Sequence, residues 1–364
     1  MSTTNAPRGP GPLPPDLSVA PWPLPLLASE VVEHTIVSQA LCDNPLGDAH
    51  ERPLWVQAPR EPVPGRRYPV AYVLPAYNGH ITMWRNRLPY RLTTIEEVEL
   101  LTADPTVPDL IVVYVESWSR YGGSQFVDSP GTGRYESYLC DEVVPFVDAH
   151  YPTLTAPEGR AVTGKSSGGY GALALPLRRP DLFGCLASHA GDALFETCFL
   201  PGFPLAARAL AEFDGDIHAY WDDFRSRVSR TKPYDYLVGI LLGVAASFSA
   251  ADDGAPILPF DPRSGRLRPE VWQRWLDRDP VRMLERPEYA AAGRGLHAVW
   301  VDAGTRDEHF LDLGAAAFVD ALTATGLPGD RVHFELFEDG HPAVEYRYPP
   351  ALRWLAERMS GSAR

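Results

Sequence analysis

One glycine-rich stretch, residues 159–175, constrains the fold of this chain more than any other: "GRAVTGKSSGGYGALAL". Its letters satisfy two motifs that need different local structures. Gly159 to Ser166 read G-x-x-x-x-G-K-S, which is typical of a phosphate-binding loop. Gly164 to Gly168 read G-x-S-x-G, which is typical of the turn that presents a nucleophilic serine. The two interpretations differ in where they place the preceding strand.

A phosphate loop requires a hydrophobic strand before its first glycine. The residues there are "YPTLTAPE", and two prolines make a poor central strand. The four spacer residues, Arg-Ala-Val-Thr, look like a strand themselves. We therefore favour "RAVT" as the strand, "GKSSG" as a sharp turn and "GYGALAL" as the start of a helix. A nucleotide-binding protein that uses the overlapping motif remains an alternative.

A serine at the tip of such a turn has a strained backbone that lifts its hydroxyl above the sheet. Glycine at Gly164 and Gly168 removes the side chains that would collide with the turn. A helix that starts at Ser167 also directs backbone N–H groups toward a developing oxyanion. The stretch therefore predicts that Ser166 is a nucleophile.

The partners of such a serine follow it in the order acid then histidine, each after a later strand. The predicted strand "LHAVWVD" and the following "AGTRDEHF" offer Asp302 and Asp307, and "DGHPAVEY" after the last strand offers His341. Asp307 lies further out in its loop, with reach toward a histidine, so we expect it to be the acid. Asp302 is expected to cap a turn.

Apolar runs bounded by turn signals alternate with helical patterns along the chain. This alternation predicts an α/β fold with a mostly parallel sheet of about eight strands flanked by helices. The expected strands are residues 31–41, 52–59, 68–75, 109–117, 159–164, 182–190, 295–304 and 331–338. The expected helices are residues 134–151, 168–179, 309–326 and 348–359. The first two strands alternate apolar and polar residues, which indicates an antiparallel edge, and Pro176 should kink or shorten its helix.

The domain organisation follows from composition and spacing. Residues 1–27 are rich in proline and are expected to be disordered or to form an extended arm. Residues 28–192 and 291–360 form the predicted core. Residues 193–290 separate two neighbouring strands and contain helical, aromatic segments, so they predict a helical insertion after the strand that follows the nucleophile. A lid over the site and a stabilising surface subdomain are both compatible with this pattern.

The charge of the chain argues against some classes of partner. The net charge is −14 and the sequence pI is about 5.2, so no basic surface is expected for nucleic acid or anionic membranes. No apolar run reaches 18 residues, and the N-terminus lacks a signal-peptide pattern, so we expect a cytoplasmic protein. The four cysteines show no zinc-ligand spacing, and no metal or organic cofactor is expected. A homo-oligomer is left open.

Five segments together resemble the esterase branch of the α/β-hydrolases, which includes S-formylglutathione hydrolases, enterochelin esterases, feruloyl esterases and mycolyltransferases. They are "YPVAYVLPAYNGH", "GRYESYLCDEVVPFVDAHY", "GRAVTGKSSGGYGALALPLRRPDLFGCLASHAG", "VDAGTRDEHF" and "EDGHPAVEY". The resemblance implies an α/β-hydrolase fold, with Asp307 as the acid and His341 as the general base. It also implies an oxyanion hole formed by the amides of Tyr77 and Ser167. Relatives usually carry His-Gly where this chain has Pro75-Ala76, which leaves the shape of that hole open.

These features predict a serine hydrolase that cleaves a small carboxylic ester or thioester through an acyl-serine intermediate. An acyltransferase that uses the same residues with an alcohol or amine acceptor is an alternative that the sequence does not separate. Polar residues at neighbouring strand ends are candidates for lining the substrate pocket. They are Glu116, Trp118, His189 and Asp192.

Overall fold

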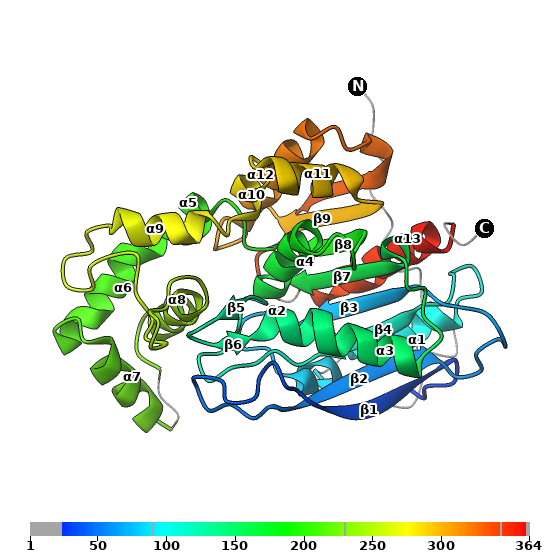
Figure 1. Cartoon of the computed structure of the whole chain (residues 1–364), viewed down its shortest axis with the longest axis horizontal. Helices are drawn as coiled ribbons and strands as arrows, with labels where there is room; N and C mark the ends of the chain where they lie inside the picture. Colours follow the sequence, from blue (N-terminus) through cyan, green and yellow to red (C-terminus); the bar gives the residue numbers. More distant parts are fainter. Residues whose placement is uncertain (1–23, 89–90, 229–230, 343, 362–364) are drawn as a thin grey trace.

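The central feature of the computed structural model, which describes residues 24–88, 91–228, 231–342 and 344–361, is an eight-stranded sheet (Figure 1). The strand order is β1-β2-β4-β3-β7-β8-β9-β10. The strands are β1 (Ser29–Val37), β2 (Glu51–Pro59), β3 (Val70–Leu74), β4 (Ile111–Val115), β7 (Arg160–Lys165), β8 (Cys185–His189), β9 (Ala298–Gly304) and β10 (Val332–Phe337). All eight predicted strands are therefore confirmed, and the predicted fold class is correct.

The register of the sheet explains its two kinds of strand. β1 pairs antiparallel with β2, and β2 pairs antiparallel with β4, as the alternating pattern of the first two strands predicted. The remaining neighbours pair in parallel, and the inner strands β3, β4, β8 and β9 are buried along their whole length. Because parallel strands end at one edge, the loops after β3, β7, β9 and β10 meet there.

Helices cover both faces of the sheet. On one face, apolar residues of α1 (Thr94–Ala103) and α13 (Tyr348–Gly361) pack against the strands. The other face is covered by α2 (Tyr135–Ser137), α3 (Val144–His150), α4 (Ser167–Arg178) and α12 (Leu311–Ala324). A π-helical turn at Tyr138–Val143 joins α2 to α3, so the single helix predicted over 134–151 is one helical segment of mixed type. A two-residue pair, β5 (Asp128–Ser129) and β6 (Gly133–Arg134), lies beside it.

Two helices differ from the sequence prediction. The helix α4 continues through Pro176 to Arg178, so the proline does not shorten this helix, which was one of the two outcomes predicted for it. Burial of α4 against the sheet and neighbouring helices outweighs the single backbone hydrogen bond that a proline removes. The helix α1 was missed. Its Thr93 and Glu96 form a capping box, a signal that the letters T-x-x-E carry.

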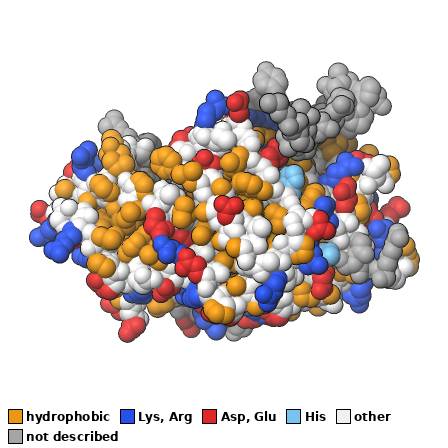
Figure 2. Space-filling model, turned by 90° about the horizontal axis from the view of Figure 1, so that it is seen from above, with side chains coloured by type: hydrophobic (Ala, Val, Ile, Leu, Met, Phe, Trp, Pro, Cys, Tyr) orange, Lys and Arg blue, Asp and Glu red, His pale blue; other side chains and the backbone are white. Residues whose placement is uncertain are grey.

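The segment between β8 and β9 is helical, as predicted. It contains α5 (Phe195–Cys198), α6 (Phe203–Leu210), α7 (Ile217–Ser226), α8 (Asp235–Phe248), α9 (Pro269–Leu276), α10 (Pro280–Met283) and α11 (Pro287–Gly295). The helices α6 to α9 extend beyond one side of the sheet (Figure 1). Aromatic rings hold them together: Phe203 stacks on Phe260 at 4.8 Å and meets Trp272 edge-on at 5.4 Å. Hydrophobic side chains gather on the surface of this half (Figure 2).

The two ends of the insertion meet at one buried carboxylate. Asp279, which is fully buried, accepts hydrogen bonds from the backbone N–H groups of Leu194 (3.1 Å) and Phe195 (2.7 Å). The chain then continues through α11, which packs against α4 and α12 as an ordinary crossover helix between parallel strands. The polypeptide between Phe195 and Asp279 therefore leaves the core and returns to it at the same place.

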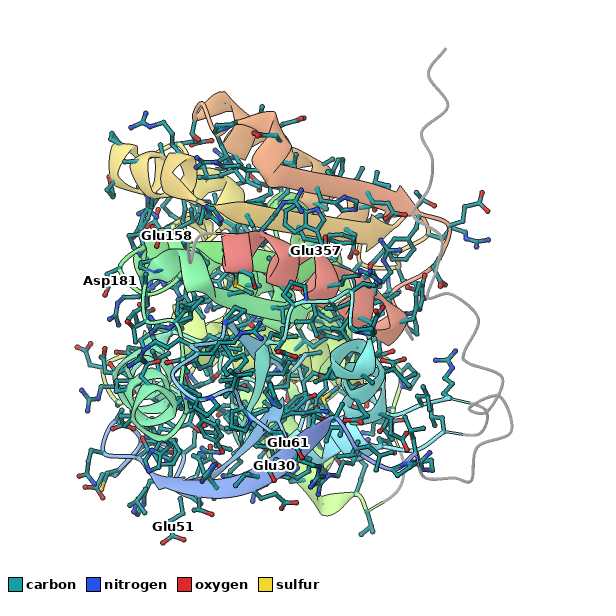
Figure 3. The ribbon with its side chains drawn as sticks, turned by 90° about the vertical axis from the view of Figure 1, so that its right-hand side faces the viewer. Glu30, Glu51, Glu61, Glu158, Asp181 and Glu357 are labelled. Atoms are coloured by element: carbon teal, nitrogen blue, oxygen red, sulfur yellow. The ribbon has the colours of Figure 1, made fainter. Side chains whose placement is uncertain are left out.

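Acidic side chains populate the amino-terminal end of the sheet. Glu158 and Asp181 come just before β7 and β8, and Glu357 lies in the second half of α13; all three are labelled in Figure 3. The carboxyl-terminal edge lies at the opposite end, beneath the insertion. In the part of the chain that the structure describes, none of the helices has the length and apolar character needed to cross a bilayer.

The segment leading into β1 is held by two buried glutamates of α1. Glu96 accepts a hydrogen bond from Leu24 N at 2.8 Å, and Glu99 accepts hydrogen bonds from the backbone N–H groups of Leu27 and Ala28, both at 2.7 Å, and from Ser29 N at 2.9 Å. The last residues of the predicted 1–27 arm are thus fixed to the core, whereas residues 1–23 lie outside the described part of the chain.

Replacing Glu99 with glutamine should lower the free energy of unfolding by about 2–3 kcal/mol, because the amide cannot accept all the hydrogen bonds that the carboxylate accepts. Urea unfolding would measure the change. Glu61→Gln, at an exposed position, is the control and should change stability by less than about 0.5 kcal/mol. Equal effects of the two variants would contradict the anchoring role of Glu99.

Candidate active site

The turn between β7 and α4 holds Ser166 in an unusual backbone conformation. Its φ is 56° and its ψ is −123°, which a residue other than glycine rarely adopts. Two hydrogen bonds fix this conformation: Ser166 N donates to His189 O at 3.0 Å, and Tyr170 N donates to Ser166 O at 2.8 Å. Ser166 is half-buried and lies between the carboxyl end of β7 and the amino end of α4.

The turn leaves no room for side chains on either side of the serine. A Cβ atom at Gly164 would lie 2.4 Å from the carbonyl carbon of Gly168. A Cβ atom at Gly168 would lie 2.3 Å from the carbonyl oxygen of Leu74 at the end of β3. Both distances are far shorter than van der Waals contact, so the G-x-S-x-G pattern is a steric requirement of this turn.

The same geometry excludes a phosphate-binding loop. Residues Arg160–Lys165 form a strand between β3 and β8, so the four spacer residues of the alternative motif cannot fold around a phosphate. The ammonium group of Lys165 lies 3.3 Å from Glu345 Oε1 instead of facing an anion site. The nucleotide-binding alternative is therefore wrong.

Two loops bring Asp307 and His341 together. Asp307 follows β9 and His341 follows β10, and Asp307 Oδ2 lies 2.8 Å from His341 Nδ1. The side chain of Asp307 is fully buried, whereas that of His341 is 14% exposed. Asp307 Oδ1 accepts a hydrogen bond from His309 N at 2.8 Å, and Glu308 accepts one from His341 N at 2.8 Å. These contacts fix both side chains relative to each other.

Asp302 has a different environment from the one expected. It lies within β9, fully buried, and contacts His189 Nδ1 at 2.8 Å and Arg347 Nε at 2.9 Å. The adjacent guanidinium and imidazole hold the pKa of this carboxyl below its usual value, although burial alone would raise that pKa. The expectation that Asp302 caps a turn was wrong, because its side chain joins a buried ion-pair network behind the sheet edge.

Ser166 borders a small cavity of about 60 Å³ under the insertion. Its walls come from the core and from α5, α8 and the Asp307 loop. The lining residues are Tyr77, Ser166, Ser167, Asp192, Cys198, Phe199, Tyr236, Leu237, Ile240, His309 and Leu311. Most of those from the insertion are apolar, so one end of the cavity suits an apolar group.

His309 connects this cavity to His341. The ring of His309 lines the cavity and meets the ring of His341 edge-on, with centroids 4.9 Å apart. Among the described residues, no hydrogen bond joins the Ser166 hydroxyl to His341, and His341 itself does not line the cavity. Sequence reasoning missed His309 as a lining residue, although its position two residues after Asp307 was a usable signal.

The two residues whose amides are expected to form an oxyanion hole, Tyr77 and Ser167, both line this cavity. Within the described ranges, neither Tyr77 N nor Ser167 N donates to a protein acceptor, so both remain available to a ligand. The Tyr77 hydroxyl is within hydrogen-bond distance of Tyr121 O and of Gly239 O, the latter 2.5 Å away in α8. Burial raises the pKa of Tyr77, which keeps this hydroxyl a donor. The loop after β3 is thus attached to the insertion.

Asp192 is the one acidic residue that lines the cavity. Its Oδ2 atom lies 3.4 Å from both Gln125 Nε2 and Ser167 Oγ, which are long contacts for a buried carboxylate. Burial, opposed by the nearby His341 and these two hydrogen bonds, raises the pKa of Asp192 to about 6. Asp192 thus lines the cavity that Ser166 borders, and its role in binding a substrate stays a prediction.

The other three expected pocket residues do not line this cavity. Glu116 is buried and accepts hydrogen bonds from Ile81 N and Trp118 N. Trp118 is 40% exposed on the surface. His189 is fully buried against Asp302 and Tyr348. These three residues do lie near the edge of the sheet, as their positions at strand ends predicted. The sequence did not reveal in which direction their side chains point.

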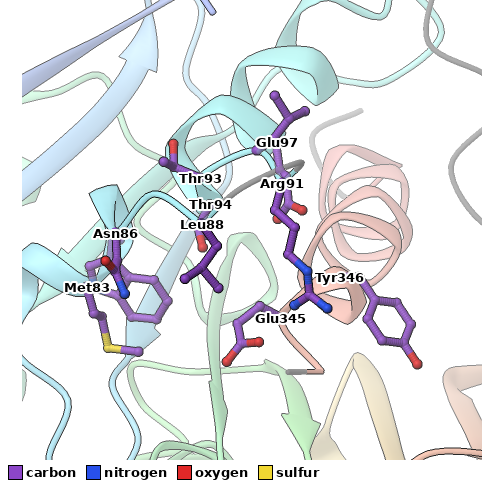
Figure 4. Close-up of a pocket in the computed structure, with 11 residues that line it drawn as sticks. Met83, Asn86, Leu88, Arg91, Thr93, Thr94, Glu97, Glu345 and Tyr346 are labelled. Atoms are coloured by element: carbon purple, nitrogen blue, oxygen red, sulfur yellow. The ribbon is translucent and has the colours of Figure 1, made fainter. Parts of the chain in front are cut away.

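A larger cavity of about 530 Å³ lies between the loop before α1 and the start of α13 (Figure 4). Arg91, Glu97 and Glu345 lie among its walls. Burial, followed by repulsion from Glu345, raises the pKa of Glu97 to about 7. This cavity contains neither Ser166 nor His341, so it is not the site built around the nucleophile turn.

The sheet order, the turn after β7 and the Asp307–His341 pair define an α/β-hydrolase. The chain belongs to the Esterase family, because the model of that family matches residues 49–328. The predicted family resemblance is therefore confirmed.

Individual relatives match shorter regions. An endo-1,4-β-xylanase/feruloyl esterase of Xylanibacter ruminicola is 28% identical over 118 residues, which are 32% of this chain and 16% of that protein. An esterase of Mycobacterium tuberculosis is 29% identical over 133 residues, which are 35% of this chain and 26% of that protein. These matches thus cover about a sixth and about a quarter of the two relatives. The structure of a ferulic acid esterase has a TM-score of 0.57 and 19% identity, with coverage of 92% of this chain and 99% of that one, which supports the fold.

The raised pKa of Asp192 predicts a pH dependence of stability. Below about pH 4 the carboxyl is protonated in both states, and above about pH 6 it is ionised in both. Between these values the unfolded state loses its proton first, so stability should fall as the pH rises, by up to about 3 kcal/mol. Asp192→Asn should remove this fall and should be more stable than the wild type at pH 7.

Urea unfolding at pH values from 4 to 8 would measure the effect. Asp320→Asn, at an exposed position of α12, is the matched control and should retain the wild-type dependence. If Asp192→Asn loses stability at pH 7, the carboxylate contributes favourable contacts that outweigh its burial, and the prediction is wrong.

Proposed function

We propose that this protein hydrolyses small carboxylic esters or thioesters through an acyl-enzyme on Ser166, with His341 as the general base and Asp307 as its orienting acid. The observation that carries the proposal is the 2.8 Å contact between Asp307 Oδ2 and His341 Nδ1, beside the cavity that Ser166 borders. The family match and the strained turn at Ser166 support the same chemistry.

The contacts of His341 suggest how the proton moves. Because Nδ1 donates to the buried Asp307 carboxylate, Nε2 is the nitrogen that can accept the Ser166 proton. The serine oxygen then bonds to the substrate carbonyl carbon, and the protonated His341 gives its proton to the departing alcohol or thiol. In the second half, water loses a proton to His341 while its oxygen bonds to the acyl carbon. The bond from this carbon to the Ser166 oxygen then breaks, His341 returns the proton to that oxygen, and the acid leaves. Asp307 stabilises the charged imidazole in both halves.

The oxyanion of each tetrahedral intermediate would be bound by the amides of Tyr77 and Ser167. Both amides are free of protein acceptors in the described part of the chain. The Ser167 amide also lies at the amino end of α4, where the helix dipole favours negative charge. Alanine at Ala76 is compatible with this loop, because Ala76 is not among the residues with positive φ.

The insertion would cover the cavity beside Ser166, which would hold the acyl group of the substrate. Tyr236, Leu237 and Ile240 of α8 close the cavity opposite Ser166. A cavity of about 60 Å³ holds only a few non-hydrogen atoms, so short acyl groups should fit best. The cover also excludes water from part of the site, which strengthens the electrostatic interactions there.

Ser166→Ala should lower kcat/KM for p-nitrophenyl acetate by at least about 10⁴-fold, because the nucleophile is lost. The variant should also lose covalent labelling by a fluorophosphonate. Lys165→Ala, at the adjacent position, is the control and should keep activity within about threefold, since the proposal gives Lys165 no chemical role. Labelling of Ser166→Ala as strong as that of the wild type would place the nucleophile elsewhere.

Ile240→Ala should shift acyl-chain preference toward longer chains, because it removes volume from the cavity wall. We expect the ratio of kcat/KM for p-nitrophenyl hexanoate to that for the acetate to rise at least about fivefold. Leu313→Ala, at an exposed position of α12, should leave the ratio unchanged. A ratio that does not move in Ile240→Ala would show that α8 does not bound the acyl group.

A further inference from the structure

A polar cavity of about 420 Å³ lies where the insertion meets the core, at the far end of α4 from Ser166. Four of the eight residues around it are arginines. The lining residues are Arg178, Phe248, Arg274, Asp277, Arg278, Met283, Arg286 and Tyr289. We refer to this site as the arginine cavity. A concentration of positive charge is unexpected in a chain with 47 acidic and 33 basic residues.

The charge in the arginine cavity is poorly neutralised. Arg178, whose side chain is only 8% exposed, is the one member of the four that forms an ion pair within the described ranges, with Glu136 at 2.8 Å. Its Nη1 atom is buried without a hydrogen-bond partner. The Arg278 guanidinium forms no hydrogen bond or ion pair with any residue that the structure describes.

The other two arginines contact only neutral groups. Arg274 donates to Ala250 O at 2.7 Å, and Arg286 donates to Asp277 O at 2.8 Å. Arg286 also packs over the ring of Tyr289, with 4.5 Å between the guanidinium carbon and the ring centroid. Such contacts position a guanidinium without reducing its charge, so donors remain for a ligand.

Nearby acidic groups do not balance these charges. Asp277 is exposed, receives a hydrogen bond from Gln273 at 2.9 Å and is the one carboxylate among the lining residues. The neighbouring Asp279 is fully buried and directed to the backbone of Leu194 and Phe195. Like charges gathered in one cavity repel each other, and a bound anion would relieve that repulsion.

We propose that the arginine cavity binds a small multivalent oxyanion, a phosphorylated or polycarboxylated molecule. Guanidinium groups bind phosphate and carboxylate oxygens through paired N–H donors. Four of them, from α4, the end of α9 and the start of α11, suit a ligand with more than one negative charge. The site is separate from the cavity at Ser166 and has a different chemical character, so its ligand is an effector and not the ester substrate.

Two helices connect the arginine cavity to the acyl site. The helix α4 begins beside Ser166 and ends at Arg178, and α8 begins beside Tyr236 and ends at Phe248. Each helix therefore has one end at each cavity. An anion that joins α4 to the loops around α9 and α10 would hold the insertion against the core. Its effect on ester turnover rests on the proposed function, whereas its binding does not.

Titration calorimetry with inorganic pyrophosphate and, separately, with citrate tests the proposal, using the full chain with Ser166→Ala so that no turnover intervenes. At least one of the two should bind with one-to-one stoichiometry at moderate salt. Arg278→Gln should weaken that binding at least tenfold. Arg266→Gln, at an exposed position of the insertion, is the matched control and should change the affinity less than twofold.

Thermal unfolding separates a ligand site from a structural role of Arg278. Without anion, Arg278→Gln should be at least as stable as the wild type, because a repulsive charge is removed. Pyrophosphate or citrate should then raise the Tm of the wild type but not of this variant. The proposal is overturned if neither anion binds, if Arg266→Gln weakens binding as much as Arg278→Gln, or if Arg278→Gln alone lowers the Tm.

Discussion

The close approach of α4 to the end of β3 is the constraint on which the site depends. Gly168 lies so near the Leu74 carbonyl that no side chain fits between them, and Gly164 is equally close to Gly168. This contact sets the distance between the Ser166 turn and the loop that carries Tyr77. Because Tyr77 also reaches α8 through its hydroxyl, the same contact fixes the position of the insertion over the serine. The local backbone packing thus organises three separate segments around one cavity.

Local signals in the sequence were sufficient to predict the strands of the sheet and which residues lie at its edge. Continuous apolar runs identified the buried strands, and the alternating pattern of β1 and β2 identified their antiparallel pairing. Position along a loop also separated two similar aspartates. Asp307, further from its strand, lies beside His341, whereas Asp302 is held inside the sheet by Arg347. The strand patterns depend on a few neighbouring residues, which a sequence displays directly, whereas the two aspartate contacts join residues 34 and 45 positions apart.

The walls of the cavities could not be predicted in this way. The apolar character of α8 shows that the helix is buried, but not that Ile240 faces the proposed nucleophile. Similarly, Glu116 and His189 occupy strand ends, and only their buried hydrogen-bond partners reveal that they point away from the cavity. The arginine cavity combines residues 111 positions apart in the chain, from Arg178 in α4 to Tyr289 in α11. Such convergence is set by tertiary packing, which has no short-range pattern.

The carboxylate of Asp279 has an implication for how this architecture can change. Because it ties the chain at Leu194 and Phe195 to the chain at Asp279, the polypeptide between these points is a module whose two ends meet at one place in the core. Such a module can be lengthened, shortened or exchanged for one of another sequence without altering the route of the core strands. Members of the Esterase family could thereby carry different insertions on the same sheet, and a chimaera joined at these positions would test what the insertion contributes to substrate selectivity.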